Sequence, residues 1–243
     1  MTPRFNLKPT EHLDAPSDKL ELNRKLFDEV APKYDFITKA LSLGRDSAWK
    51  RALIRILPEK RNASCLDLAC GTGDLTRLLG ARFPDAKIEG LDLTPGMLEI
   101  ARTRTEDQRI LFVQGNMNEL PYSDESIDIV TGSYALRNTP ELGHTLEEIY
   151  RILKPGGIAA FLDFSKPKNK IGQGITHGLL KFWGGFWGIL LHRNADVYGY
   201  IADSLKRFPD RPSIRRLLTE RQLKLIQSKK CFGGILEILI VEK

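Results

Sequence analysis

Between residues 64 and 164 the chain alternates short apolar segments with segments of helical periodicity, and this alternation constrains the fold more than any other feature. Strands separated by helices cannot pair as hairpins, so they are expected to form a parallel sheet with helices on both faces. Connections between parallel strands are right-handed, which leaves few topologies. The expected strands are 65–69, 87–93, 110–114, 127–131 and 158–164, and the helices between them are 74–82, a helix that begins at Pro95, and 141–153.

The segments on either side of this region complete the predicted domain. Two helices precede it, one from Ser17 to Pro32 and one that Asp46 caps and Pro58 ends. Near the C-terminus two apolar segments flank a Gly-Gly pair and predict a hairpin at the sheet edge. We therefore expect an α/β fold, with a mostly parallel seven-stranded sheet, helices on both faces and a C-terminal antiparallel hairpin formed by 223–230 and 235–242.

Within this architecture we expect one domain, 18–243, which contains a helical cap at 18–58 and an apolar, lid-like insertion at 168–210. The preceding residues, 1–17, are polar and rich in proline, and they predict a flexible arm. The three cysteines form no CxxC pair, and the scattered histidines show no metal-ligand spacing. We therefore expect no disulfide framework and no metal site.

The charge of the 243-residue chain is unevenly distributed. The formal net charge is +6, but the residues after 165 include 15 basic and 6 acidic side chains, a balance of +9. Such a basic region fits nucleic acid, an anionic membrane surface or a solvated face. No recognition motif accompanies it, so nucleic acid is not expected as a partner.

The segment 171–191 is the most apolar in the chain and contains six glycines. It is about long enough to span a bilayer, but Gln173, His177 and Lys181 interrupt it. Two interpretations stay open at this stage. The segment is either an apolar lid or surface-lying segment flanked by basic residues, or a buried helix of an ordinary core.

The clearest local signal for a ligand is the turn that follows the first predicted strand. Gly71 and Gly73 surround Thr72, and glycines at a strand end let a ligand approach the backbone. Asp92 ends the second predicted strand, where a carboxylate can accept hydrogen bonds from both ribose hydroxyls of an adenosine group. This pattern favours a nucleoside-containing cofactor.

The cofactor is not expected to be NAD. A dinucleotide fingerprint needs a third glycine, and Thr76 stands at that position. Asp67 precedes the turn, where it could meet a positively charged amino-acid end. After the third strand, Asn116 and the Met117 backbone could form hydrogen bonds with adenine.

The chain resembles the ubiquinone/menaquinone biosynthesis C-methyltransferase family, a class I S-adenosylmethionine-dependent group. The resemblance covers about residues 20 to 222, and it is most specific in stretches outside the glycine turn. These stretches are 27–35 with 42–50, 133–138, and 150–157 with 163–167, and a weaker match follows at 198–209.

The resemblance implies a Rossmann-like class I methyltransferase fold and S-adenosylmethionine as cofactor. It further implies that the chain is an S-adenosylmethionine-dependent methyltransferase and that it methylates a ring carbon of a prenylated quinol. The substrate would be demethylmenaquinol or the equivalent benzoquinol of the ubiquinone pathway. No residue in the sequence distinguishes a naphthoquinol from a benzoquinol. The cofactor positions of the family fall on Thr72, Asp92, Asn116, Met117 and Ser133.

Three residues are candidates for the chemistry of the transfer. Arg137 follows the fourth strand and could hold a water or a phenolate oxygen, and Asp163 near the end of the fifth strand could act as a base. Tyr34 could bind substrate and close the site from the N-terminal helices. Each has a purely structural alternative: a loop-fixing ion pair for Arg137, a cap or a hydrogen bond to the lid for Asp163, and packing for Tyr34.

Two other functions stay open from the sequence. The chain could methylate another lipophilic or aromatic metabolite, or it could be a cofactor-binding relative without transfer chemistry. The expected location is cytoplasmic or peripheral at the inner face of the membrane. Transient contact with an anionic membrane surface and a homodimer are compatible with this interpretation, in addition to the lipophilic quinol.

Overall fold

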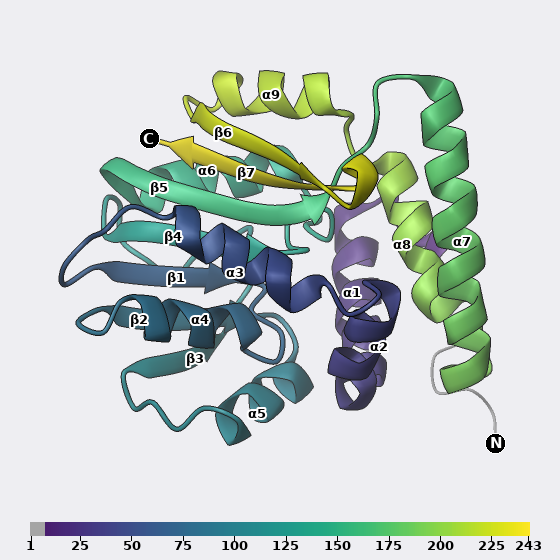
Figure 1. Cartoon of the computed structure of the whole chain (residues 1–243), viewed down its shortest axis with the longest axis horizontal. Helices are drawn as coiled ribbons and strands as arrows, with labels where there is room; N and C mark the ends of the chain where they lie inside the picture. Colours follow the sequence, from purple (N-terminus) through teal and green to yellow (C-terminus); the bar gives the residue numbers. More distant parts are fainter. Residues whose placement is uncertain (1–7) are drawn as a thin grey trace.

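The computed structural model describes residues 8–243 and contains one seven-stranded sheet with the strand order β3-β2-β1-β4-β5-β7-β6 (Figure 1). The five strands β1 to β5 pair in parallel, and β7 runs antiparallel to both β5 and β6. The predicted mostly parallel sheet and its C-terminal hairpin are therefore confirmed. The strands are β1 Ser64–Leu68, β2 Lys87–Asp92, β3 Ile110–Gln114, β4 Ile127–Ser133, β5 Leu153–Phe164, β6 Lys224–Cys231 and β7 Leu236–Glu242.

Helices cover both faces of the sheet, and each central strand supplies apolar side chains to both. On β1, Cys65 packs in the cluster under α3 and α4, whereas Leu66 and Leu68 pack in the cluster under α6 and α9. A strand buried on both faces reads as a continuous apolar run, which is why the sequence pattern located these strands. The covering helices are α3 Asp46–Ile56, α4 Asp74–Arg82, α6 Leu142–Ile152 and α9 Arg211–Glu220, while α5 Pro95–Thr103 packs on β2 and β3.

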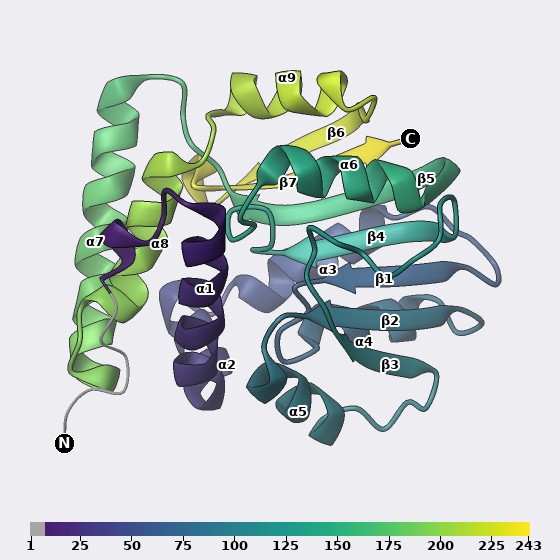
Figure 2. The ribbon, with the colours of Figure 1, turned by 180° about the vertical axis from the view of Figure 1, so that it is seen from behind.

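Four further helices stand together at the end of the sheet to which the carboxyl ends of the parallel strands point (Figures 1 and 2). They are α1 Pro16–Val30, α2 Tyr34–Leu41, α7 Lys170–His192 and α8 Asp196–Arg207. The expected cap at 18–58 is thus only partly at this end. Helix α3 lies instead on a sheet face, because Leu53 and Ile54 pack against the strands.

The structure describes only part of the predicted N-terminal arm 1–17, and its flexibility stays a prediction. Residues 8–15 lie against the domain, where Leu13 is buried in the same cluster as Tyr200 and Asp14 pairs with Arg207 at 2.6 Å. The residues before Lys8 lie outside the described part of the chain.

Helix α7 packs closely on α8 through two of its glycines. A Cβ atom on Gly184 would meet the carbonyl oxygen of Tyr198, and one on Gly188 would meet that of Asn194. The opposite face of α7 is exposed to solvent, so the interpretation of 171–191 as a buried core helix is wrong. Between Lys8 and Lys243 no helix combines the length and apolarity needed to cross a membrane.

We predict that Gly188→Ala destabilises the protein by about 2 kcal/mol, because the added methyl group must push α7 away from α8. Gly178→Ala, in the same helix but facing open space, is the matched control and should stabilise by about 0.5–1 kcal/mol. Urea unfolding followed by circular dichroism measures both. Equal effects of the two substitutions would contradict the close packing.

Candidate active site

Two adjoining cavities lie where the parallel strands end. The strand-end cavity is lined by backbone and side chains that follow β1, β2, β3 and β4. The helical cavity lies mainly between α1, α2, α7 and α8. The two share Phe27, Tyr34, Tyr134 and Asn138 in their walls, so a ligand in one cavity lies next to a ligand in the other.

The glycine turn after β1 is held against the end of β2 by a carboxylate. Asp92 Oδ2 accepts the Gly71 N–H at 2.8 Å, and its Oδ1 accepts the Thr94 N–H at 2.9 Å. The side chain is 8% exposed and lines the strand-end cavity, and burial raises the pKa of its carboxyl. Each oxygen keeps a lone pair, so Asp92 can still accept the two hydroxyl groups of a ribose.

Five of the predicted cofactor residues line the strand-end cavity together: Gly71, Asp92, Asn116, Met117 and Ser133. They come from four strand ends: Gly71 follows β1, Asp92 ends β2, Asn116 and Met117 follow β3, and Ser133 ends β4. This gathering follows from the parallel sheet, because the carboxyl ends of parallel strands meet at one edge.

Two residues of the glycine turn act beside this cavity rather than in its wall. Thr72 is buried, and its hydroxyl donates to Asp35 Oδ1 of α2 at 2.7 Å. Gly73 has a φ of +80° and caps α4, and a Cβ there would lie 3.0 Å from the Phe112 ring. Both residues shape the turn, which leaves Gly71 as the glycine that faces the ligand space.

Asp67 is not placed where the sequence suggested. Its carboxylate is 1% exposed and accepts hydrogen bonds from the hydroxyls of Thr76 at 2.7 Å and Thr131 at 2.8 Å. Burial raises its pKa to about 6, although both hydroxyls and Lys50 act in the opposite direction. Asp67 therefore fastens α4 and β4 under the glycine turn and is not part of the cavity wall.

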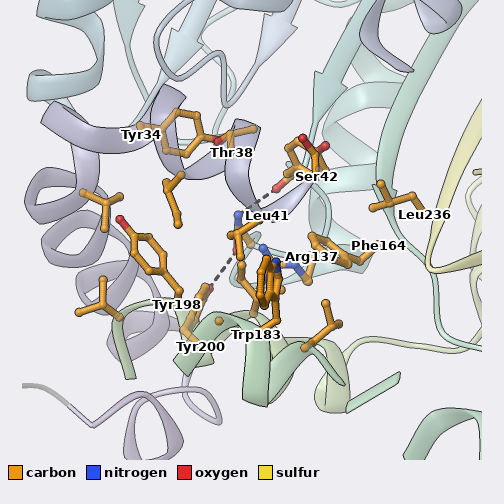
Figure 3. Close-up of a pocket in the computed structure, with 18 of the residues that line it drawn as sticks. Tyr34, Thr38, Leu41, Ser42, Arg137, Phe164, Trp183, Tyr198, Tyr200 and Leu236 are labelled. Atoms are coloured by element: carbon orange, nitrogen blue, oxygen red, sulfur yellow. Dashed lines mark hydrogen bonds between the residues drawn. The ribbon is translucent and has the colours of Figure 1, made fainter. Parts of the chain in front are cut away.

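The helical cavity has apolar walls and contains Arg137 as the one charged side chain among the described residues that line it. Figure 3 shows Arg137 among the rings of Phe164, Tyr200 and Trp183. Its guanidinium carbon lies 5.1 Å from the Phe164 ring centroid and 5.5 Å from that of Tyr200, and Nη1 donates to Ser204 Oγ. The side chain is 4% exposed, and its Nε has no hydrogen-bond partner within the described chain.

Asp163 lies behind Arg137 and outside the helical cavity. Its Oδ2 accepts the backbone N–H of Arg137 at 3.1 Å, and its Oδ1 accepts that of Phe164 at 2.7 Å. Burial raises the pKa of this carboxyl, and the charge of Arg137 opposes the rise. This geometry agrees with the structural alternative for Asp163, because both of its oxygens accept hydrogen bonds from backbone N–H groups, those of Arg137 and Phe164.

Tyr34 lies at the junction of the two cavities. Its ring is the nearest side chain to the Cα face of Gly71, 3.7 Å from where a Cβ would stand, and it contacts Phe27 edge-on. Burial raises the pKa of Tyr34 to about 12, so its hydroxyl stays protonated. This position agrees with a role at the meeting point of cofactor and substrate, which stays a prediction.

A buried polar network that sequence reasoning did not identify forms part of the wall between the cavities. The Tyr200 hydroxyl lies 2.6 Å from Asn23 Oδ1 and 3.0 Å from Asn138 Oδ1, and Asn138 Nδ2 donates to the Tyr134 carbonyl. Figure 3 shows the hydrogen bond that reaches Tyr200. The only sequence signal was that 133–138 and 198–209 belong to the stretches of resemblance, and pairing residues 62 positions apart needs the fold.

Comparison with known proteins agrees with this geometry. The sequence model of the ubiE/COQ5 methyltransferase family matches residues 16–243. A demethylmenaquinone methyltransferase from Symbiobacterium thermophilum is 36% identical over 85% of this chain and 86% of its own length. A 2-phytyl-1,4-naphtoquinone methyltransferase from Thermosynechococcus vestitus is 33% identical over 90% of this chain and 97% of its own.

Solved structures show the same fold at lower identity. A methyltransferase from Haloferax volcanii, solved with its Trm112 activator, has a TM-score of 0.66 at 19% identity, covering 89% of this chain and 96% of its own. A geranyl diphosphate C-methyltransferase from Streptomyces coelicolor has a TM-score of 0.62 at 14% identity, covering 81% and 79%. The predicted Rossmann-like class I methyltransferase fold is therefore confirmed.

We predict that Asp92→Ala raises the dissociation constant of S-adenosylmethionine about 100-fold, because two hydrogen bonds to a carboxylate are lost. Isothermal titration calorimetry measures the affinity directly. Asp85→Ala, an exposed acid just before the opposite end of the same strand, is the control and should leave the affinity unchanged. Wild-type affinity in Asp92→Ala would remove Asp92 from the binding site.

We also predict a pH effect on stability from Asp67. Its pKa is near 4 when unfolded and about 6 when folded, so the folded state binds more protons in this interval. The stabilising contribution is present below pH 4 and is lost as pH rises to 6, by at most about 3 kcal/mol. The free energy of unfolding of wild type should thus fall relative to Asp67→Asn between pH 4 and 6, and parallel curves would contradict the raised pKa.

Proposed function

Because the chain belongs to the ubiE/COQ5 methyltransferase family, we propose that it methylates a ring carbon of a prenylated quinol with S-adenosylmethionine as methyl donor. The chain is an S-adenosylmethionine-dependent methyltransferase, and two relatives that match most of its length are named for demethylmenaquinone and for a phytyl naphthoquinone. One observation supports the quinol most directly: a single buried cation stands in an apolar cavity that adjoins the strand-end cavity.

The strand-end cavity fits the cofactor. The carboxylate of Asp92 offers acceptors for a ribose, and the backbone of Gly71 offers an approach that no side chain blocks. Asn116 and Met117, which line the same cavity, are proposed to bind the adenine ring, and Ser133 adds a hydroxyl. When bound, S-adenosylmethionine supplies an electrophilic methyl group, and the shared wall at Tyr34 and Tyr134 is where that group would meet the substrate.

The helical cavity fits the ring and the first part of a prenyl tail. Its walls are mostly aliphatic and aromatic, with Leu180, Trp183 and Leu236 among them, so an apolar ligand gains free energy by leaving water. A quinol also carries oxygen atoms, which need a partner once they are buried. The unpartnered Nε–H of Arg137 can donate to one of them.

Arg137 is suited to stabilise the ring oxygen as it becomes negative. Loss of the hydroxyl proton to water raises electron density at the neighbouring ring carbon, which then attacks the methyl group more readily. The hydrogen that this carbon carried leaves as a proton to water, which restores the aromatic ring. A guanidinium stays protonated at any physiological pH, so Arg137 stabilises the oxyanion and does not accept its proton. Phe164, Tyr200 and Ser204 fix the guanidinium, and Asp163 fixes the backbone beneath it.

The enzyme is proposed to work at a membrane surface, because a prenylated quinol resides in the bilayer. The balance of +9 in residues 166–243 supports contact with an anionic surface. A peripheral location at the inner face of the membrane follows from this proposal, and the homodimer stays a prediction.

The proposed function is tested by offering purified enzyme labelled S-adenosylmethionine with demethylmenaquinol and, separately, with the demethylated benzoquinol. The relatives named for naphthoquinones make demethylmenaquinol the expected substrate. Label in the quinol fraction supports the proposal. Absence of label from both quinols would favour another lipophilic or aromatic metabolite, or a relative without transfer chemistry.

In the same assay, we predict that Arg137→Ala lowers turnover about 100- to 1,000-fold, because the oxyanion loses the one cationic side chain that lines the cavity among residues 8–243. The affinity for S-adenosylmethionine should change little, since Arg137 lines the helical cavity and not the strand-end cavity. Arg137→Lys keeps the charge and should recover part of the turnover. Arg216→Ala, on the exposed side of α9, is the control, and wild-type turnover in Arg137→Ala would refute the assigned role.

A further inference from the structure

Helix α7 carries an apolar surface that nothing in the described chain covers. Of the eleven large hydrophobic side chains that are exposed in residues 8–243, seven belong to this one helix. They recur at intervals of three or four residues, which places them along one side of the helix. This outer face of α7 consists of Ile171, Ile175, Leu179, Phe182, Phe186, Ile189 and Leu190.

The inner side of the same helix forms a wall of the helical cavity. Leu180, Trp183 and Gly184 line that cavity, so α7 separates the proposed quinol site from the outside by the thickness of one helix. At its side, Trp187 contacts the exposed Phe36 of α2, with ring centroids 5.7 Å apart. The exposed apolar surface therefore extends from α7 to Phe36 of α2.

The charges around the outer face of α7 are of one sign. From 170 to 192 the helix has no acidic residue, exposed Lys168 and Lys170 stand at its beginning, and exposed Arg193 stands at its end. The acids beside it are engaged within the chain. Asp203 pairs with Lys181 at 2.7 Å, and Glu29 lies 3.3 Å from His192.

We infer that the outer face of α7 inserts in the plane of an anionic bilayer interface and that quinol enters the helical cavity along this helix. An apolar stripe with basic residues at its ends matches the acyl and headgroup layers of such an interface. The glycine contacts with α8 and the Lys181–Asp203 pair hold α7 flat against the protein, so it lies on the membrane rather than spanning it. The inference rests on the proposed function only for the identity of the substrate, a quinol.

A second copy of the chain would fit this surface less well. If two α7 helices packed antiparallel about a two-fold axis, Lys168 and Lys170 of one would face Arg193 of the other. Like charges at both ends of the contact would oppose the pairing, whereas anionic headgroups would neutralise them.

The direct test is co-sedimentation of the full chain with phosphatidylcholine vesicles that contain phosphatidylglycerol. The double variant Phe182→Ser/Phe186→Ser should bind the vesicles at least about tenfold more weakly than wild type, because two exposed rings lose their place in the interface. The matched control is Leu111→Ser/Ile226→Ser, which removes two exposed apolar side chains from β3 and β6 and should bind as wild type does. Equal binding by wild type and the α7 variant would overturn the inference.

A second measurement does not depend on the behaviour of that variant. In Trp49→Phe, the remaining tryptophans are Trp183 and Trp187 of α7. Their fluorescence should be quenched by vesicles whose acyl chains carry bromine, and absence of quenching would overturn the insertion. Light scattering gives the oligomeric state. If wild type is a dimer, Phe182→Ser/Phe186→Ser is a monomer and vesicle binding is unchanged, the outer face of α7 binds a second copy of the chain instead.

Activity separates this inference from the proposed function. With a long-tailed quinol embedded in vesicles, Phe182→Ser/Phe186→Ser should show at least about tenfold lower turnover than wild type, and with a short-tailed quinol in water the two should be equal. Neither phenylalanine lines the helical cavity. If wild type methylates no quinol, the proposed function fails, but the vesicle experiments still show whether the outer face of α7 binds a membrane. If the variant loses turnover equally on both quinols, entry of quinol along α7 is overturned.

Discussion

Parallel pairing of β1 to β5 is the constraint on which the rest of the molecule depends. Each of these strands needs a crossover before the next can pair in parallel, and the crossovers place helices on both faces of the sheet. The same pairing aligns the carboxyl ends of the strands at one edge. Polar residues that are tens of positions apart, such as Gly71, Asp92 and Ser133, therefore line one cavity without any direct sequence relation.

The buried charged side chains near that edge differ in how many of their hydrogen bonds the protein itself satisfies. Asp67 uses both carboxylate oxygens on threonine hydroxyls, and Asp163 uses both on backbone N–H groups, so each serves as a fixed support. Asp92 uses only part of its hydrogen-bonding capacity on backbone N–H groups, and the Nε–H of Arg137 has no partner among residues 8–243. Since a buried polar group without a partner is costly, the incomplete groups mark where ligands are expected to bind.

Helix α7 packs closely on the protein with one side and exposes an apolar surface on the other. Its glycines let the backbone approach α8 closely, which holds a mostly apolar helix on the protein although half its circumference faces outward. The inner half closes an apolar cavity, and the outer half presents an apolar surface with basic ends. An anionic lipid interface would cover the exposed apolar area and neutralise the positive charge at the same time.

The sequence by itself determined the alternation of strands and helices, the strand-end glycines and the polar residues beside them, because periodicity and turn chemistry act over a few neighbouring residues. These features sufficed for the fold and for Gly71, Asp92, Asn116 and Met117, whereas Ser133 was assigned through the resemblance to the methyltransferase family. Only the tertiary structure decided that Asp67 and Asp163 point their oxygens inward, that α3 lies on the sheet, and that Tyr200 reaches Asn138. Such outcomes depend on which distant partner saturates each polar group, and local patterns carry no information about that partner.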